Sequence, residues 1–150
     1  AIIFSFPVIG SMVPKIAESD ATEVGKTLAA HQLAYLISMI PFGLLLTIHE
    51  RQILEIIFFN SGVELNEAVV SELFLGYVGV SMTLINVYAG ISRGNHLHYA
   101  PILSLSIILP ILAIFLVESI TDMANLVAFS AWIIFLFSIV IFMSSIRTIR

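Results

Sequence analysis

Cysteine is absent from the 150 residues, and charged side chains are scarce. Without cysteine, the chain has no disulfide framework, no thiol nucleophile and no cysteine metal site. Charged residues make up only 11% of the chain, whereas an ordinary soluble domain has about a quarter. This scarcity excludes a water-soluble globular protein, a disordered chain and a nucleic-acid-binding protein with a basic face. We therefore expect no nucleic-acid partner.

Hydrophobic residues, in contrast, make up 59% of the chain and gather into long runs. A membrane core of about 30 Å takes about 20 helical residues to cross. Four runs without Lys, Arg, Asp or Glu reach or approach that length: residues 27–48, 73–91, 100–117 and 124–146. Because a backbone in lipid must satisfy its own hydrogen bonds, we expect each run to be a helix. The predicted fold class is all-α, a polytopic membrane helix bundle with four full transmembrane helices.

The segment 1–13 (AIIFSFPVIGSMV) is also apolar. It has neither the basic start nor the small-residue cleavage site of a signal peptide. We interpret it as the end of a further span whose beginning precedes the sequence, so residues 1–150 are expected to form a partial transmembrane lobe. A polar connector follows, in which Ser19 or Asp20 is expected to cap the next helix.

Lys and Arg are distributed unevenly between the two sides that alternating spans define. One side holds all but one of the six, and the other side holds Arg51 alone. Because cytoplasmic loops of membrane proteins are enriched in Lys and Arg, residues 14–26, residues 92–99 and the C-terminus are predicted to be cytoplasmic. We expect a multi-pass protein of the cytoplasmic membrane, surrounded by membrane lipid.

Proline and glycine interrupt three of the four predicted spans. Pro41 and Gly43 lie in the middle of the first span, and Pro110 lies in the middle of the third. Proline loosens a helix, which suits a segment that bends as a cavity opens. Membrane helices also carry Pro and Gly for close packing. These three residues are therefore hinge candidates, with close packing as the alternative.

The second predicted span has the most polar character within the membrane. Thr83, Asn86 and Gly90 follow at spacings of three and four residues and so share one helical stripe, whereas Ser81 and Tyr88 cannot both join it. A buried Asn in lipid either bonds to another helix or faces water. Thr83, Asn86 and Tyr88 are therefore candidates for interhelical hydrogen bonding or for lining a hydrophilic path.

Two cations at the ends of the spans are candidates for contact with phosphate: Arg51 and Arg93. Arg51 belongs to the sequence HER (residues 49–51), which fits either a helix cap with a local ion pair or a polar cluster at a cavity mouth. The planar guanidinium of Arg suits phosphate. Arg93 begins a basic loop, residues 93–99, which fits either a membrane anchor or a contact with phosphate head groups.

Residues that would carry out catalysis or hold a metal are not apparent in the sequence. The HER sequence resembles the start of a zinc-protease helix, but Ile53 stands where that motif needs its second His. His96 and His98 are too few for a metal site. We therefore predict no catalytic residue, no metal site, no cofactor and no enzyme activity.

The order of these features resembles that of the polysaccharide (O-antigen type) flippases. The string FPVIGSMVPKIAESD is similar to the end of the second helix of a six-helix lobe in that family. A span with Ile40-Pro41 near its middle, a short outer helix ending ILEIIFFNSG and a span ending NVYAGISRGNH follow in the same order. The wider superfamily also holds lipid-linked peptidoglycan flippases and multidrug and toxin extruders.

The resemblance implies transport by alternating access between two lobes that enclose a hydrophilic cavity. This chain would be the end of helix two through helix six of one lobe, and its partner would be the second lobe of the same polypeptide. The implied substrate is a lipid-linked oligosaccharide or polysaccharide precursor, with its diphosphate in the cavity and its polyprenyl tail in lipid. The substrate-path candidates are then Lys15, Arg51, Thr83, Asn86, Tyr88 and Arg93.

Two other functions are open on the sequence. A multidrug extruder of the same superfamily usually needs an acidic residue within a span, and none of the four full predicted spans has one. A small structural membrane subunit would need these 150 residues to be the complete chain.

Overall fold

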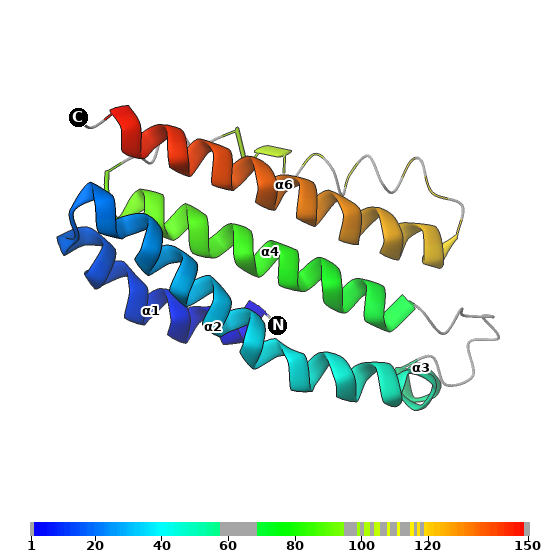
Figure 1. Ribbon diagram of the computed structural model, residues 1–150. Coiled ribbons are helices and arrows are strands. Elements are labelled where there is room, and N and C mark those ends of the chain that lie inside the picture. The colour runs from blue at the N-terminus through cyan, green and yellow to red at the C-terminus, as the bar shows by residue number, and fades with distance from the viewer. Residues whose placement is uncertain are drawn as a thin grey trace.

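The protein is all-helical in the part that the computed structural model describes, namely residues 2–57, 69–94, 119–148 and some residues between 99 and 117. These residues form no strand. The helices are α1 (Ile2–Glu18), α2 (Ala21–Ile48), α3 (Glu50–Ile57), α4 (Val69–Ile91) and α6 (Ile120–Thr148) (Figure 1).

Three helices are long and apolar enough to cross a membrane: Thr22–Ile48, Val69–Ile91 and Ile120–Ser145. They confirm the predicted spans 27–48, 73–91 and 124–146, each of which is extended at its N-terminal end. The predicted span 100–117 lies largely outside the described residues, as do its hinge candidate Pro110 and the histidines of the basic loop. The described residues therefore form an all-helical structure with three candidate membrane spans.

Helix α1 is longer than its apolar sequence, and most of the polar connector predicted over residues 14–26 is helical. The helix continues through Pro14 to Glu18, and α2 already begins at Ala21. Asp20 holds the predicted N-cap position with an extended backbone, but its side chain makes no capping hydrogen bond. A helix can continue into polar sequence, because water solvates its polar side chains and its end groups once it leaves the apolar layer.

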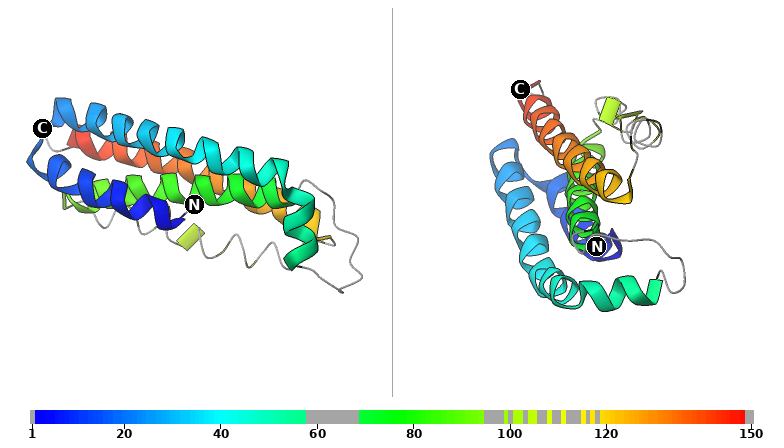
Figure 2. Two further views of the ribbon diagram at one scale, coloured as in Figure 1. Left: turned by 90° about the horizontal axis from the view of Figure 1, so that it is seen from below. Right: turned by 90° about the vertical axis from the view of Figure 1, so that its right-hand side faces the viewer.

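Helix α4 lies at the centre of the bundle, with α1 and α2 on one side and α6 on the other (Figures 1 and 2). Its residues are mostly buried, whereas α2 presents much of its surface outward. The short helix α3 turns across the bundle at the end where α2 finishes (Figure 2). In this placement α4 packs against each of the other four described helices.

Small residues bring α4 and α6 close together. A Cβ atom built on Gly76 would lie 3.2 Å from Cα of Ala128, and one built on Gly79 would lie 3.1 Å from Cβ of Ala131. Glycine and alanine allow such an approach because they leave the helix backbones bare. Gly76 and Gly79 therefore allow the close packing of α4 against α6.

Pro41 lies inside α2, which stays helical through it and changes direction along its length (Figure 1). A missing N–H and the ring of proline together account for such bends. The neighbouring residues are in contact with other helices: the Phe42 ring lies 4.7 Å from the Phe4 ring, and a Cβ on Gly43 would lie 2.9 Å from Phe74. The hinge candidates Pro41 and Gly43 thus lie where α2 contacts both α1 and α4.

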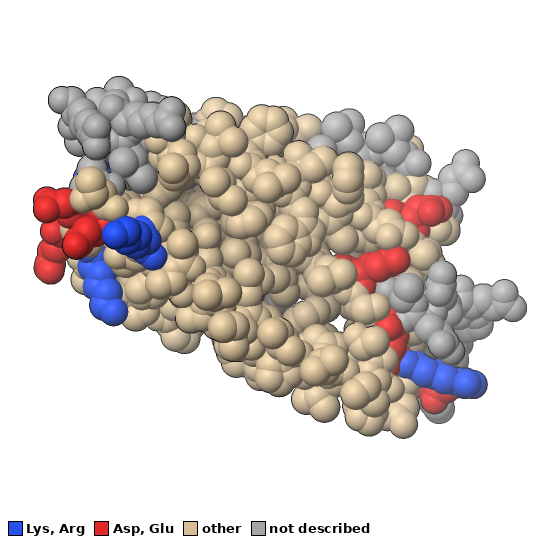
Figure 3. All heavy atoms as spheres, in the orientation of Figure 1, with Lys and Arg blue, Asp and Glu red and all other residues tan. Residues whose placement is uncertain are grey.

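Charged side chains on the face seen in Figure 3 gather at the two ends of the bundle and leave an apolar band between them. Lys15, Lys26 and Arg93 mark one end, which we call the basic end, and α3 with Arg51 marks the opposite end, which we call the α3 end. A band of this kind is expected where lipid chains surround a protein.

Candidate functional site

A chain of hydrogen bonds joins α2, α4 and α6 inside the bundle. Gln32 Nε2 donates to Asn86 Oδ1 at 2.5 Å, and Asn86 Nδ2 donates to Ser138 Oγ at 2.6 Å. The Ser138 hydroxyl in turn donates to the carbonyl of Phe135 at 2.7 Å. Asn86 and Ser138 are both 0% exposed. We call Gln32, Asn86 and Ser138 the three-helix network.

The polar stripe predicted on the second span faces this network. Thr83, Asn86 and Gly90 are all buried, as their shared helical face requires. Thr83 Oγ1 donates to the Gly79 carbonyl at 3.0 Å within its own helix. Tyr88 is 39% exposed and lies away from this face. Of the two predicted roles for Asn86, the geometry therefore shows interhelical hydrogen bonding.

Sequence reasoning missed the two partners of Asn86. Gln32 could have been predicted from the sequence, because it is a side-chain amide within a predicted span and such a group needs a hydrogen-bond partner. Ser138 could not have been predicted, because a serine in a membrane helix can satisfy its hydroxyl by a hydrogen bond to a backbone carbonyl of its own helix. Each bond of this kind between membrane helices contributes about 0.6–2 kcal/mol. The network thus stabilises one particular arrangement of three helices.

Arg93 joins the end of α4 to the end of α1. Its Nη1 donates to the carbonyls of Ser19, at 2.9 Å, and Ile16, at 3.3 Å. The last carbonyls of a helix have no intrahelical partner and carry the negative end of the helix dipole, so a cation is favoured there. In this arrangement Arg93 caps α1 instead of presenting its charge to solvent.

The other two cation candidates are exposed and lie far from the network. Arg51 Nε donates to Glu55 Oε1 at 3.2 Å, with the two side chains 78% and 66% exposed, which gives the expected local ion pair. Lys15 is exposed at the basic end. The substrate-path candidates therefore do not converge on one site: Thr83 and Asn86 lie inside the bundle, and the cations lie at its two ends.

Glu50, the middle residue of the HER sequence, is buried. It is only 6% exposed, and its Oε1 accepts hydrogen bonds from the backbone N–H groups of Val70, at 2.7 Å, and Ser71, at 3.2 Å. Its Oε2 accepts from the Ser71 hydroxyl at 3.0 Å. A carboxylate satisfies the orphan N–H groups at a helix start and suits the positive end of the dipole. Glu50 therefore fastens α3 to the first turn of α4.

We predict that Glu50→Ala lowers the free energy of unfolding by about 1–3 kcal/mol, because it leaves buried N–H groups of α4 without a partner. Denaturant titration of the purified protein in detergent measures this loss. The matched control is Glu55→Ala on the same helix, which removes an exposed ion pair worth about 0–1 kcal/mol. Equal losses for the two variants would contradict the role given to Glu50.

The described residues contain no group of three or more His, Asp or Glu side chains placed to hold a metal ion. Comparison with known proteins adds no relative: no protein-family model, curated protein or solved structure matches the chain. The geometry of the three-helix network and of the two bundle ends is therefore the basis for any functional conclusion.

Proposed function

We propose that this chain is part of a transporter that flips a lipid-linked oligosaccharide or polysaccharide precursor across the cytoplasmic membrane by alternating access. The observation that supports the proposal is the three-helix network, in which Asn86 is fully buried between Gln32 and Ser138. The order of sequence features that resembles the flippases supports the choice of substrate.

The network suits alternating access because amides can exchange their partners. When α2 and α4 are in contact, Gln32 Nε2 donates directly to Asn86 Oδ1, and Asn86 Nδ2 donates to Ser138. When the two helices separate, the same groups bind water or the hydroxyl groups of a sugar, so neither arrangement leaves a buried polar group unpaired. Pro41 within α2 is the proposed hinge about which α2 bends away from α4.

The remaining candidates take roles according to their position. Arg51 and Lys15, exposed at the two ends, attract the diphosphate on either side of the membrane. Arg93 binds it after release from the α1 carbonyls, and Thr83 lines the opened path beside Asn86. Tyr88 faces outward, toward lipid or the second lobe of the same polypeptide.

The proposed orientation places the basic end in the cytoplasm, and the absence of cysteine from these 150 residues makes it simple to test. We predict that a membrane-impermeant maleimide added to intact cells labels Gln52→Cys, on exposed α3, and leaves exposed Lys26→Cys unlabelled. Both variants should react after the membrane is permeabilised, which controls for accessibility. Labelling of Lys26→Cys alone in intact cells would reverse the orientation.

Transport itself is tested with the native polypeptide reconstituted in liposomes that contain a fluorescent polyprenyl diphosphate-linked sugar. We predict that the protein exposes the inner-leaflet lipid to an impermeant quencher, and that Asn86→Ala slows this flipping at least about tenfold, equivalent to about 1.4 kcal/mol. Asn125→Ala, which changes an exposed amide on α6, is the matched control. Absence of flipping with polyprenyl diphosphate sugars of differing glycan would contradict the proposed function.

A further inference from the structure

His31 lies inside the membrane-spanning part of α2, next to Gln32 of the network. It lies five residues beyond Lys26, the last charged residue of the basic end on this helix, which is about 7.5 Å further along the helix axis. Charged residues of the three described spans lie nearer their ends, among them Glu23 and Lys26 of α2. Ionisable groups within membrane-spanning helices are rare and costly, and proton relays are one of the functions that they serve.

A hydrogen bond fixes which ring nitrogen of His31 is basic. Nδ1 lies 2.7 Å from the carbonyl oxygen of Thr27. A carbonyl only accepts hydrogen bonds, so Nδ1 carries the hydrogen and Nε2 keeps the lone pair. The side chain is half-buried, and no described residue makes a hydrogen bond to Nε2. Nε2 is therefore a free proton acceptor within a span.

The position of His31 on α2 connects it to the network. Val24, Leu28, Tyr35 and Met39 form the buried stripe of this helix, and His31 lies along that stripe. No charged or titratable side chain on α2 or on the helices packed against it is bonded to the ring; these side chains are Lys15, Glu18, Glu23, Lys26, Tyr35, Glu50, Arg51, Glu55, Glu72, Tyr77 and Tyr88. A proton on Nε2 thus creates a charge that has no hydrogen-bonded counterion among these side chains.

We propose that His31 is a proton-binding site whose occupancy is coupled to the separation of α2 from α4. This inference rests on the proposed function, because it assigns the ion that gates the same movement. A proton from water binds at Nε2, and the resulting cation has one N–H on the Thr27 carbonyl and a second N–H that needs an acceptor. A charge is costly in a dry bundle, so protonation favours the arrangement in which water reaches α2. Deprotonation returns the proton to water and favours the closed network.

The test combines flipping rates with a direct measurement of the ring. Flipping of the fluorescent polyprenyl diphosphate sugar is followed between about pH 5 and pH 8, the range in which histidine changes charge. We expect the rate to change by up to about tenfold per pH unit on one limb, as binding of one proton requires. His31→Gln should remove this dependence, and His49→Gln, at the α3 end, should keep it. In parallel, ¹⁵N-histidine NMR in lipid nanodiscs follows the signal that His31→Gln removes.

The outcomes separate this inference from the proposed function. A pH dependence of flipping that survives in His31→Gln overturns the proton site and leaves the flippase proposal standing. If His31 titrates and shifts the side-chain amide signals of Gln32 and Asn86 while no lipid is flipped, the proton site stands and the flippase proposal fails.

Discussion

Replacement of Gly79 by leucine is expected to force α4 away from α6 and to leave little folded protein. A Cβ at this position would lie 3.1 Å from Cβ of Ala131, 3.2 Å from its carbonyl carbon and 3.3 Å from the backbone nitrogen of Trp132. Helix backbone cannot move aside as a side chain can, so the remaining leucine atoms have no space. We expect a loss of about 3 kcal/mol or more in the free energy of unfolding, measured by denaturant titration in detergent.

The matched control is Gly10→Leu in α1, where a Cβ would meet nothing within 4 Å. Leucine is also a better helix former than glycine, by about 0.5–1 kcal/mol. We therefore expect Gly10→Leu to be neutral or slightly stabilising. A Gly79→Leu protein as stable as the wild type would show that α4 and α6 do not pack as closely as described.

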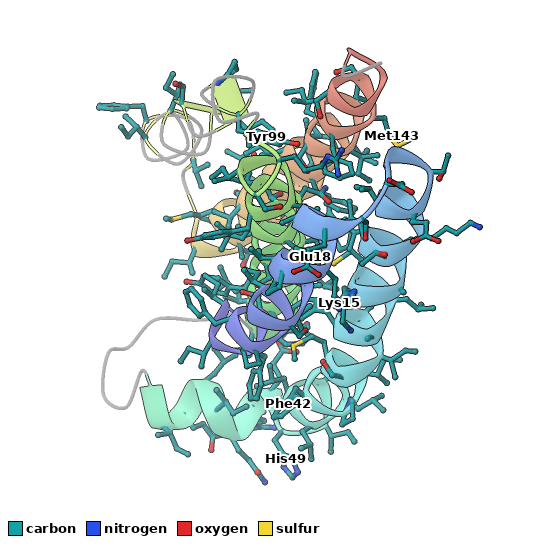
Figure 4. The ribbon with its side chains drawn as sticks, turned by 90° about the vertical axis from the view of Figure 1, so that its left-hand side faces the viewer. Lys15, Glu18, Phe42, His49, Tyr99 and Met143 are labelled. Carbon is teal, nitrogen blue, oxygen red and sulfur yellow. The ribbon has the colours of Figure 1, made fainter. Side chains whose placement is uncertain are left out.

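Gly90→Ala is expected to expel the Tyr99 ring from its site at the end of α4. A Cβ on Gly90 would lie 2.0 Å from Cε2 and 2.2 Å from Cζ of Tyr99, which is fully buried beside α4 (Figure 4). Burial raises the pKa of Tyr99 to about 12, so the ring is neutral in this contact. Loss of a buried aromatic side chain costs about 3–5 kcal/mol. Denaturant titration of the variant measures that loss.

A double-mutant cycle identifies the source of the Gly90→Ala effect. Tyr99→Ala alone removes the ring and should be strongly destabilising. In that background, Gly90→Ala should cost almost nothing, because the atoms it collides with are gone. Equal costs of Gly90→Ala in the two backgrounds would refute the contact with Tyr99 as the cause.

Hydropathy predicted the C-terminal ends of α2 and α4 well. The predicted ends at residues 48 and 91 agree with the ends of α2 and α4 at Ile48 and Ile91. It failed where a helix continues beyond the apolar layer, as α1 does through Pro14 to Glu18. Helix formation depends on backbone hydrogen bonds, and these persist in polar sequence.

The candidate site was predictable only in part. Asn86 stood out because an amide within a span must find a partner, and the structure provides Gln32 and Ser138. The pairing itself depends on how three helices pack, which local sequence does not specify. Arg93 and Glu50 show the same limit, since each caps a helix that is remote from it in the sequence.

The movement of α2 against α4 can be tested by locking the two helices together during transport. Because the chain has no cysteine, Gln32→Cys and Asn86→Cys introduce the only thiols in the 150 residues, and a short reducible cross-linker can join them. In liposomes with the fluorescent polyprenyl diphosphate sugar, we expect cross-linking to stop flipping and reduction to restore the slower rate of the same double variant before cross-linking. A cross-linked protein that flips the lipid as fast as the reduced one would contradict transport by separation of α2 from α4.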